Sequence, residues 1–190
     1  LTYDLKGKVW FAVPVGVNQL DENKHAITMM KEIANHYKGN DNVRFVAISI
    51  NGVDLGVEPK DLKDSMNQLG INDERWWFLT TGNTKKQRGY IKDQLRLGIV
   101  SERSDEDPEG KWKFPSQIAL IDREMHIRQR YDFREAAQFE RAASELLMEK
   151  PELKDNEKFE SALNAVDKLK DTLYTNTDFV LSETKTGSRE

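Results

Sequence analysis

The feature that most constrains this chain is a near-continuous apolar run, VWFAVPVGV, at residues 9–17. Such a run, bounded by Gly7 and Asn18, is typical of a strand that is buried on both faces of a mostly parallel sheet. Pro14 has no N–H to donate to a central ladder, so we expect the strand to end near Val13. The run therefore predicts an α/β fold.

After this strand the apolar residues change their spacing. Ile27, Met30, Ile33 and Tyr37 recur at helical intervals, which predicts a helix that begins near Asp21 and stops at Gly39. Further strands and helices alternate with it, and a hairpin and a last helix close the series. The order predicts a mixed sheet flanked by helices, with strands at 43–50, 76–79, 116–122 and 126–131, and helices at 61–69, 85–97 and 133–148.

The chain has 190 residues, which is the length of one domain with an appendage. We expect one domain over residues 1–150 and an extension over 151–190. In the extension, apolar residues from Phe159 to Leu173 predict one additional C-terminal helix. We expect this helix to pack on its own domain, with a partner protein as the alternative. Residues 182–190 are a polar tail.

Charge and composition exclude several classes of function. Twenty-nine basic and thirty-three acidic residues give a net charge of −4, so we expect no nucleic-acid partner. No apolar run approaches the ~20 residues of a membrane span. The chain has no cysteine, which excludes disulfides, thiolate nucleophiles, iron–sulfur clusters and cysteine-bound zinc. Three histidines leave little for a histidine-based metal site, and we expect no cofactor.

Four strings appear in an order that points to a known family. They are GKVW at 7–10, VRFVAISI at 43–50, WWFLTTG at 76–82 and IALIDREMHIRQRYD at 118–132. These strings resemble those of the Sco/SenC family, thioredoxin-like proteins that handle copper in cytochrome oxidase assembly. The resemblance covers roughly residues 5–148, and it implies a thioredoxin-like fold.

The copper chemistry of that family does not carry over to this chain. Family members have a Cys-x-x-x-Cys after the first strand, and without gaps that pair falls on Gln19 and Asn23. Their third copper ligand is a histidine, and that position falls on or near Phe114. Amide oxygens suit hard cations, whereas Cu(I) selects soft sulfur. The resemblance thus implies a copper site that has lost all three ligands.

Two residues before the hairpin are candidates for a binding edge. Thioredoxin-like proteins carry a cis-proline at the place that Pro115 takes here, so the resemblance leads us to expect a cis bond. Trp112 lies in a charged loop just before it, and we expect its side chain to be partly exposed and to contact a partner. We also expect Gln19 and Asn23 to lie in the first turn of the first long helix, close to this loop.

Other patterns have ordinary structural interpretations. His25 and Met29 are spaced i, i+4 and, with Met30 beside them, could bind Cu(I), but the favoured interpretation is that Met30 fills the core and His25 faces solvent. The carboxylates at 102–109 and at 54–61 lack EF-hand spacing and are interpreted as solvated loops. Trp76 and Trp77 are neighbours in a strand, so they are expected to pack on opposite faces of the sheet.

The sequence therefore favours a non-catalytic protein of this type that acts through protein contact. By resemblance, its setting is the periplasm or an equivalent compartment, near respiratory oxidase assembly. The chain starts at Leu1 without a signal pattern, so we expect a trimmed or mature form whose N-terminal membrane anchor lies outside this sequence. The alternative is a metal carrier with non-thiol ligands, built from His25, Met29 and the region of Gln19 and Asn23. An enzyme is a third hypothesis, for which no nucleophile–base pair can be named.

Overall fold

A computed structural model describes residues 2–104, 106–108 and 110–183 of the chain. It divides into two compact units, Leu1–Arg130 and Tyr131–Glu190. The first unit contains the sheet and the segments that the sequence marks as a candidate site. The boundary that the sequence predicts at residue 150 stays a prediction.

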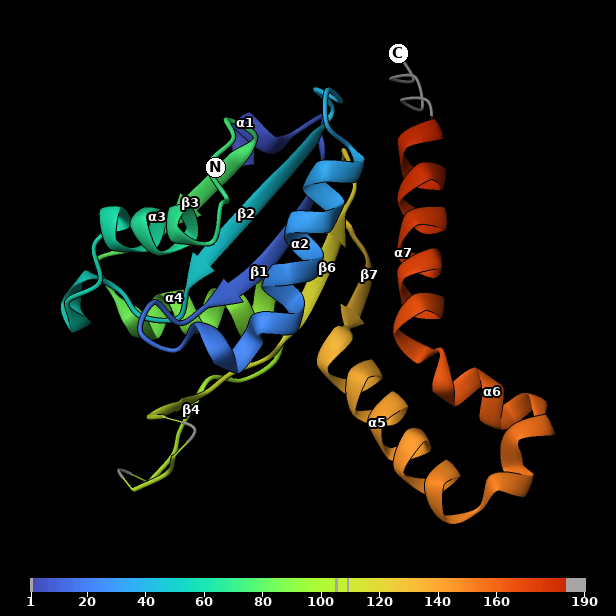
Figure 1. Cartoon of the computed structure of the whole chain (residues 1–190). Coiled ribbons are helices and arrows are strands. Elements are labelled where there is room, and N and C mark those ends of the chain that lie inside the picture. Colours follow the sequence, from blue (N-terminus) through green and yellow to red (C-terminus); the bar gives the residue numbers. More distant parts are fainter. Residues whose placement is uncertain (1, 105, 109, 184–190) are drawn as a thin grey trace. The chain divides into compact units, whose positions relative to one another are not determined.

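The elements follow the predicted order with a few additions (Figure 1). The strands are β1 (Val9–Val15), β2 (Val43–Ser49), β3 (Trp76–Leu79), β4 (Ser101–Glu102), β5 (Trp112–Lys113), β6 (Gln117–Ile121) and β7 (Ile127–Asp132). The helices are α1 (Thr2–Leu5), η1 (Leu20–Asn23), α2 (Lys24–His36), η2 (Val53–Leu55), α3 (Pro59–Gln68), α4 (Thr84–Gly89), η3 (Tyr90–Gln94), α5 (Phe133–Glu149), η4 (Pro151–Asp155), α6 (Glu157–Leu163) and α7 (Ala165–Ser182).

Five of the strands form one mixed sheet in the order β3-β2-β1-β6-β7. β1 is central and runs parallel to β2, which runs parallel to β3, whereas β6 is antiparallel to β1. In this register Phe11 lies opposite Phe45 of β2 and Leu120 of β6. Every residue of β1 is buried, which confirms the strand that the apolar run predicts. The fold is the thioredoxin-like α/β fold that the resemblance implies.

The two faces of β1 pack against different layers, because successive side chains of a strand point to opposite faces. Trp10 and Ala12 belong to a hydrophobic cluster with Ile91 of η3. Phe11 stacks on Phe45, with ring centroids 5.7 Å apart. The central strand is thus covered on both sides, as a parallel sheet requires.

The paired tryptophans of β3 show the same alternation. Trp76 stacks on Phe45, with ring centroids 5.0 Å apart. Trp77 packs against the cluster that contains Trp10. The two rings therefore lie on opposite faces of the sheet, which confirms the prediction.

The predicted end of the first strand is wrong, because β1 continues through Pro14 to Val15. The Val15 carbonyl accepts a hydrogen bond from Ile50 N beyond the end of β2. Its neighbour Pro14 therefore has its nitrogen on the β6 side, where the pairing ends at Ala12. No ladder donor is lost there, so a proline is tolerated in a central strand.

Two local features differ from the sequence prediction. The helix expected over 85–97 is α4 followed by one π turn, η3, which ends at Gln94. Within the charged loop, β4 and β5 pair antiparallel, with Glu102 opposite Trp112. We refer to residues 101–113 as the β4–β5 hairpin.

The second unit consists of helices. α5 packs against α6 and α7, and Glu140 of α5 accepts a hydrogen bond from Val166 N at the start of α7 (2.8 Å). The single helix expected in this region is divided at Asn164 into α6 and α7. The Asn164 side chain donates to Glu160 O (3.0 Å), a local bond that competes with a continuous helix. None of the described helices is long and apolar enough to cross a membrane.

Candidate functional site

The residues that the sequence marks as a site lie at one edge of the sheet. β1, β2 and β3 run parallel and end at this edge, and the antiparallel β6 begins there. We call it the site edge. Gln19 and Asn23 follow β1, whereas Trp112, Phe114 and Pro115 precede β6. The topology therefore brings together two segments that lie more than ninety residues apart.

Gln19 joins these two segments through both ends of its side-chain amide. Its Nε2 donates to Trp112 O (3.0 Å), and its Oε1 accepts from Trp112 N (2.9 Å). Gly110 has a φ of +91°, and a Cβ there would lie 2.6 Å from the Gln19 Nε2. The Gln19 amide occupies the place of that Cβ. The positive φ and the lack of space therefore both favour glycine at position 110.

A buried ion pair reinforces this connection. The Arg103 Nη2 lies 2.8 Å from the Glu22 Oε2, and the two side chains are only 9% and 5% exposed. Arg103 also donates to Trp112 O through Nη1 (2.7 Å) and lies 3.6 Å from Asp107. We call Gln19, Glu22, Arg103 and the Trp112 backbone the polar latch, because together they hold the β4–β5 hairpin against η1.

Asn23, which the resemblance leads us to expect at the second cysteine position of the family, is fully buried. Its Nδ2 donates to Pro14 O, and its Oδ1 has no hydrogen-bond partner among the described residues. Gln19 immediately precedes η1, and Asn23 immediately precedes α2. Gln19 thus precedes the 3-10 turn η1 and Asn23 is its last residue, so neither lies inside the first turn of α2, where both were expected.

Phe114, which the resemblance leads us to expect at or near the histidine position of the family, is 1% exposed. Its ring lies against Gly16 at the end of β1, where a Cβ would come within 2.9 Å of two ring carbons. A hydrocarbon ring in this place has no atom that could bind a metal. It fills the space between the end of β1 and the start of β6.

The expectation of a cis bond at Pro115 is wrong, because the peptide bond that precedes this proline is trans. Trans is the favoured isomer of an X–Pro bond by about 0.5–1 kcal/mol unless the surroundings impose the other. Pro115 packs close to Gly98, where a Cβ would lie 2.9 Å from its Cγ.

Trp112 is partly buried, as predicted, and its ring is covered by a cation. The Arg88 guanidinium lies 3.8 Å from the ring centroid, within the range of a cation–π contact. Arg88 is held there by hydrogen bonds to Ile50 O (3.0 Å) and Asn51 Oδ1 (2.7 Å). Burial lowers the pKa of Arg88, while nearby carboxylates oppose this shift. The Trp112 ring is therefore held at a fixed place on the site edge.

The donor atoms at the site edge do not fit Cu(I). The Gln19 amide is taken up by the Trp112 backbone, and Phe114 is a hydrocarbon. The non-thiol alternative also lacks a shared site, because His25 is exposed whereas Met29 is 4% exposed and lies in the core. Within residues 2–104, 106–108 and 110–183, no group of three His, Asp or Glu side chains could hold a metal ion.

The acidic loop after β2 has a structural role. Asp54 accepts hydrogen bonds from the Thr84 hydroxyl (2.5 Å) and from Thr84 N, and these bonds hold its pKa below the ordinary value. Glu58 and Asp61 form a capping box at the start of α3. These three carboxylates are therefore used as caps, which agrees with their interpretation as an ordinary loop.

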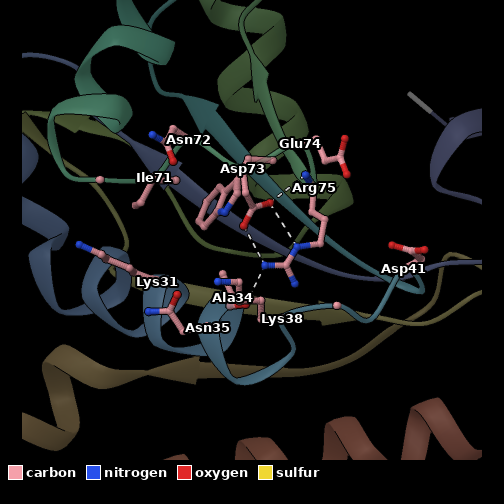
Figure 2. Close-up of a pocket in the computed structure, with 13 residues that line it drawn as sticks. Lys31, Ala34, Asn35, Lys38, Asp41, Ile71, Asn72, Asp73, Glu74 and Arg75 are labelled. Carbon is pink, nitrogen blue, oxygen red and sulfur yellow. Dashed lines mark hydrogen bonds and ion pairs between the residues drawn. The ribbon is translucent and has the colours of Figure 1, made fainter.

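A cavity of about 310 Å³ lies at the other edge of the sheet, before β2 and β3 begin (Figure 2). Arg75 in its wall donates to Tyr37 O and Ala34 O, both at 2.7 Å, and pairs with Asp73. These bonds satisfy carbonyls at the C-terminal end of α2. The cavity wall is thus part of the scaffold, and none of the residues predicted for the site lines it.

Sequence reasoning missed Arg88, Glu22 and Arg103. Glu22 and Arg103 are 81 residues apart, and no spacing or periodic pattern connects them. The only sequence signal was the excess of charge in the loop that contains Arg103, which is also typical of solvated loops. Trp112 was found because a tryptophan between two lysines is unusual in such a loop.

Comparison with known proteins gives matches of structure only. No family model matches the chain, and no curated protein matches it in sequence. A SCO1/SenC family lipoprotein from Bacillus anthracis is similar over 69% of this chain and 74% of its own, with 23% identity and a TM-score of 0.55. BsSco, a member of the Sco family of cytochrome c oxidase assembly proteins, is similar over 68% and 73%, with 20% identity and a TM-score of 0.52.

A copper-bound Sco protein from Arabidopsis thaliana is similar over more of the chain. The match covers 92% of this chain and 88% of that one, with 11% identity and a TM-score of 0.54. At these identities the likeness concerns the fold. The chain therefore has the Sco/SenC type of thioredoxin-like fold, without any cysteine.

Proposed function

We propose that this protein is a non-catalytic relative of the Sco/SenC proteins that acts by binding another protein at its site edge. The observation that carries the proposal is the polar latch. Gln19 stands at the first cysteine position and binds the Trp112 backbone, and the Glu22–Arg103 pair is buried beside it. The edge that performs metal and thiol chemistry in the family is here built as a fixed surface.

The latch holds the Trp112 backbone, while its ring packs on the hydrophobic cluster around Trp10 and lies under the Arg88 guanidinium, so only part of the residue is left for contact. The ring is partly exposed, and it is one of the residue types that most often dominate protein interfaces. Side chains that are already fixed before binding lose little conformational entropy on binding. A fixed, partly exposed tryptophan is therefore a favourable anchor for a partner.

Respiratory oxidase assembly is the setting that we propose for this contact. It is supported by BsSco, which is described as a member of a family of cytochrome c oxidase assembly proteins. The Bacillus anthracis protein is described as a lipoprotein, which supports an extracytoplasmic, membrane-tethered location. The proposed setting and the proposed location both rest on likeness of fold, so the partner must be identified directly.

The test is capture of partners from solubilised membranes with the tagged protein, followed by identification of the bound proteins. We expect oxidase subunits or other assembly proteins to be retained by the wild type and lost with Trp112→Ala. This variant keeps the hydrogen bonds of the latch, because Gln19 and Arg103 bind the backbone of residue 112. Lys38→Ala, at the other edge, is the control and should retain the same proteins.

A Cu(I) titration tests the other half of the proposal. Without thiolate ligands, we expect no Cu(I) binding tighter than about micromolar. Stoichiometric Cu(I) binding with a dissociation constant well below micromolar would show that the protein is a metal carrier instead. If Trp112→Ala still captures every protein that the wild type captures, the site edge is excluded as the contact surface.

A further inference from the structure

We propose that the site edge recognises an acidic segment of its partner, one that carries both carboxylates and apolar side chains. The inference rests on the proposed function and names the chemistry of the partner. It is carried by a basic stripe, which consists of Lys85, Arg88 and Lys92 on one helix together with Lys111 of the β4–β5 hairpin.

The three helical residues of the stripe share one face. Lys85, Arg88 and Lys92 are spaced i, i+3 and i+7 across α4 and η3, so their side chains lie in one row. The Lys85 and Lys92 side chains are exposed. Lys85 has no ion pair with any residue of the described ranges, and Lys92 lies only loosely beside Asp93, at 3.8 Å. Both ammonium groups are therefore accessible to a ligand.

Arg88 connects this row to the tryptophan. Its Nε and Nη2 bind Ile50 O and Asn51 Oδ1, which fixes the guanidinium over the Trp112 ring. The Nη1 makes no hydrogen bond to a described residue. A guanidinium that is fixed in this way can donate to a carboxylate with little further ordering. On the hairpin, the Lys111 Nζ lies 5.5 Å from the centroid of the same ring.

Exposed apolar side chains of η2 lie near the start of α4, where the stripe begins. Among the described residues of the first unit, the large hydrophobic side chains that are exposed are Val53 (39%), Leu55 (53%) and Ile99 (64%). Val53 and Leu55 belong to η2, which Asp54 joins to Thr84 at the start of α4. A ligand that follows the stripe therefore meets apolar as well as cationic groups.

Charge favours a protein segment over an anionic membrane. The four cations of the stripe outnumber the carboxylates beside them, which are Asp54, Asp93 and Glu102, so the stripe is a small local excess of positive charge on a chain whose net charge is −4. Its margin holds acidic groups, since Glu102 pairs with Lys111 at 3.0 Å. A flat anionic surface would meet these acidic groups together with the lysines. A peptide can place its carboxylates between them.

The test uses fluorescence anisotropy of a short labelled peptide with several glutamates and two leucines. A counterpart peptide has glutamine at each glutamate position. We expect the acidic peptide to bind at least about tenfold more tightly, and to bind more weakly as ionic strength rises from about 0.02 to 0.15 M. Lys85→Gln should weaken binding about twofold to fivefold, as the loss of one exposed ion pair does.

Lys86→Gln is the matched control, because it removes the same charge one residue away, off the face of the stripe. Equal affinity for the two peptides would overturn the inference, and so would equal losses with Lys85→Gln and Lys86→Gln. Binding to vesicles with phosphatidylglycerol in the absence of peptide binding would assign the stripe to a membrane instead.

The two proposals fail in different ways. If partners are captured through Trp112 but capture is insensitive to Lys85→Gln and to salt, the contact function stands and the acidic partner is wrong. If the acidic peptide binds but no protein is captured through Trp112, the basic stripe stands and the contact function is wrong.

Discussion

Single residues at the site edge are held in place by packing and hydrogen bonds. Gln19 has the donor and the acceptor of a peptide unit at the end of a short side chain, so it pairs with the Trp112 backbone as a neighbouring strand would. Phe114 fills the space between the end of β1 and the start of β6. Each of these two side chains is used in a structural contact, which is why we regard this edge as a built surface.

Gly16 tests the packing of Phe114. A Cβ at this position would lie 2.9 Å from the ring, so Gly16→Ala should destabilise the fold by about 1–3 kcal/mol in urea unfolding. Phe114→Leu in the same chain makes room and should recover part of the loss. Gly82→Ala is the control, because nothing lies within 4 Å of a Cβ there. An unchanged stability of Gly16→Ala would show that the ring is not held against β1.

The buried Glu22–Arg103 pair tests the latch. Arg103→Met removes the guanidinium that lies 2.8 Å from the largely buried Glu22 carboxylate, so the unfolding free energy should fall by about 3–5 kcal/mol. The double variant Glu22→Leu with Arg103→Met removes both charges. Its unfolding free energy should fall by less than that of Arg103→Met alone. If the double variant is instead less stable than Arg103→Met, the stability lost by Arg103→Met does not come from the buried Glu22 charge.

Among the elements, those with a clear apolar period could be predicted from the sequence. The inward residues of α2 are buried as expected, and β1 and β2 pair in the predicted parallel sheet. The continuation of β1 through Pro14 to Val15, the π turn of η3 and the β4–β5 pairing could not be predicted. Each depends on a neighbour distant in the chain or on one hydrogen bond, and neither changes the period of apolar residues.

The β6–β7 hairpin gives a prediction for pH. Burial raises the pKa of Asp122, but hydrogen bonds from His126 N, Glu124 N and Arg128 outweigh it and hold the pKa below its ordinary value. A carboxyl with a lowered folded-state pKa stabilises the fold above its unfolded-state pKa. It loses that contribution as the pH falls through the folded-state pKa.

Asp122→Asn should therefore lower the unfolding free energy at pH 7 by about 1–2 kcal/mol. The difference from the wild type should shrink as the pH falls below about 4. Chemical unfolding at a series of pH values measures it. Glu124→Gln removes the same charge from an exposed side chain of the same turn and should have little effect at either pH. A pH-independent gap between Asp122→Asn and the wild type would contradict the assignment.

For the molecule as a whole, the sequence could predict the sheet and the place of the site but not its construction. The strings around β1, β2, β3 and β6 place Gln19 and Phe114 at one edge. The contacts between these segments join residues 81 and 93 positions apart, and such pairs leave no pattern in a single sequence. The cis bond at Pro115 was expected from the family and is absent, because the resemblance does not carry backbone geometry residue by residue.

The central claim is that the site edge, without metal or thiol chemistry, is where this protein meets its partner. The most direct measurement is photo-crosslinking in membranes, with a photoreactive phenylalanine analogue at Lys113 on the site edge or at Lys38 by the cavity of Figure 2. Both side chains are exposed, so each tolerates the change. We predict a crosslinked partner from position 113 and none from position 38. A partner that crosslinks only from position 38, or none from position 113, would contradict the claim.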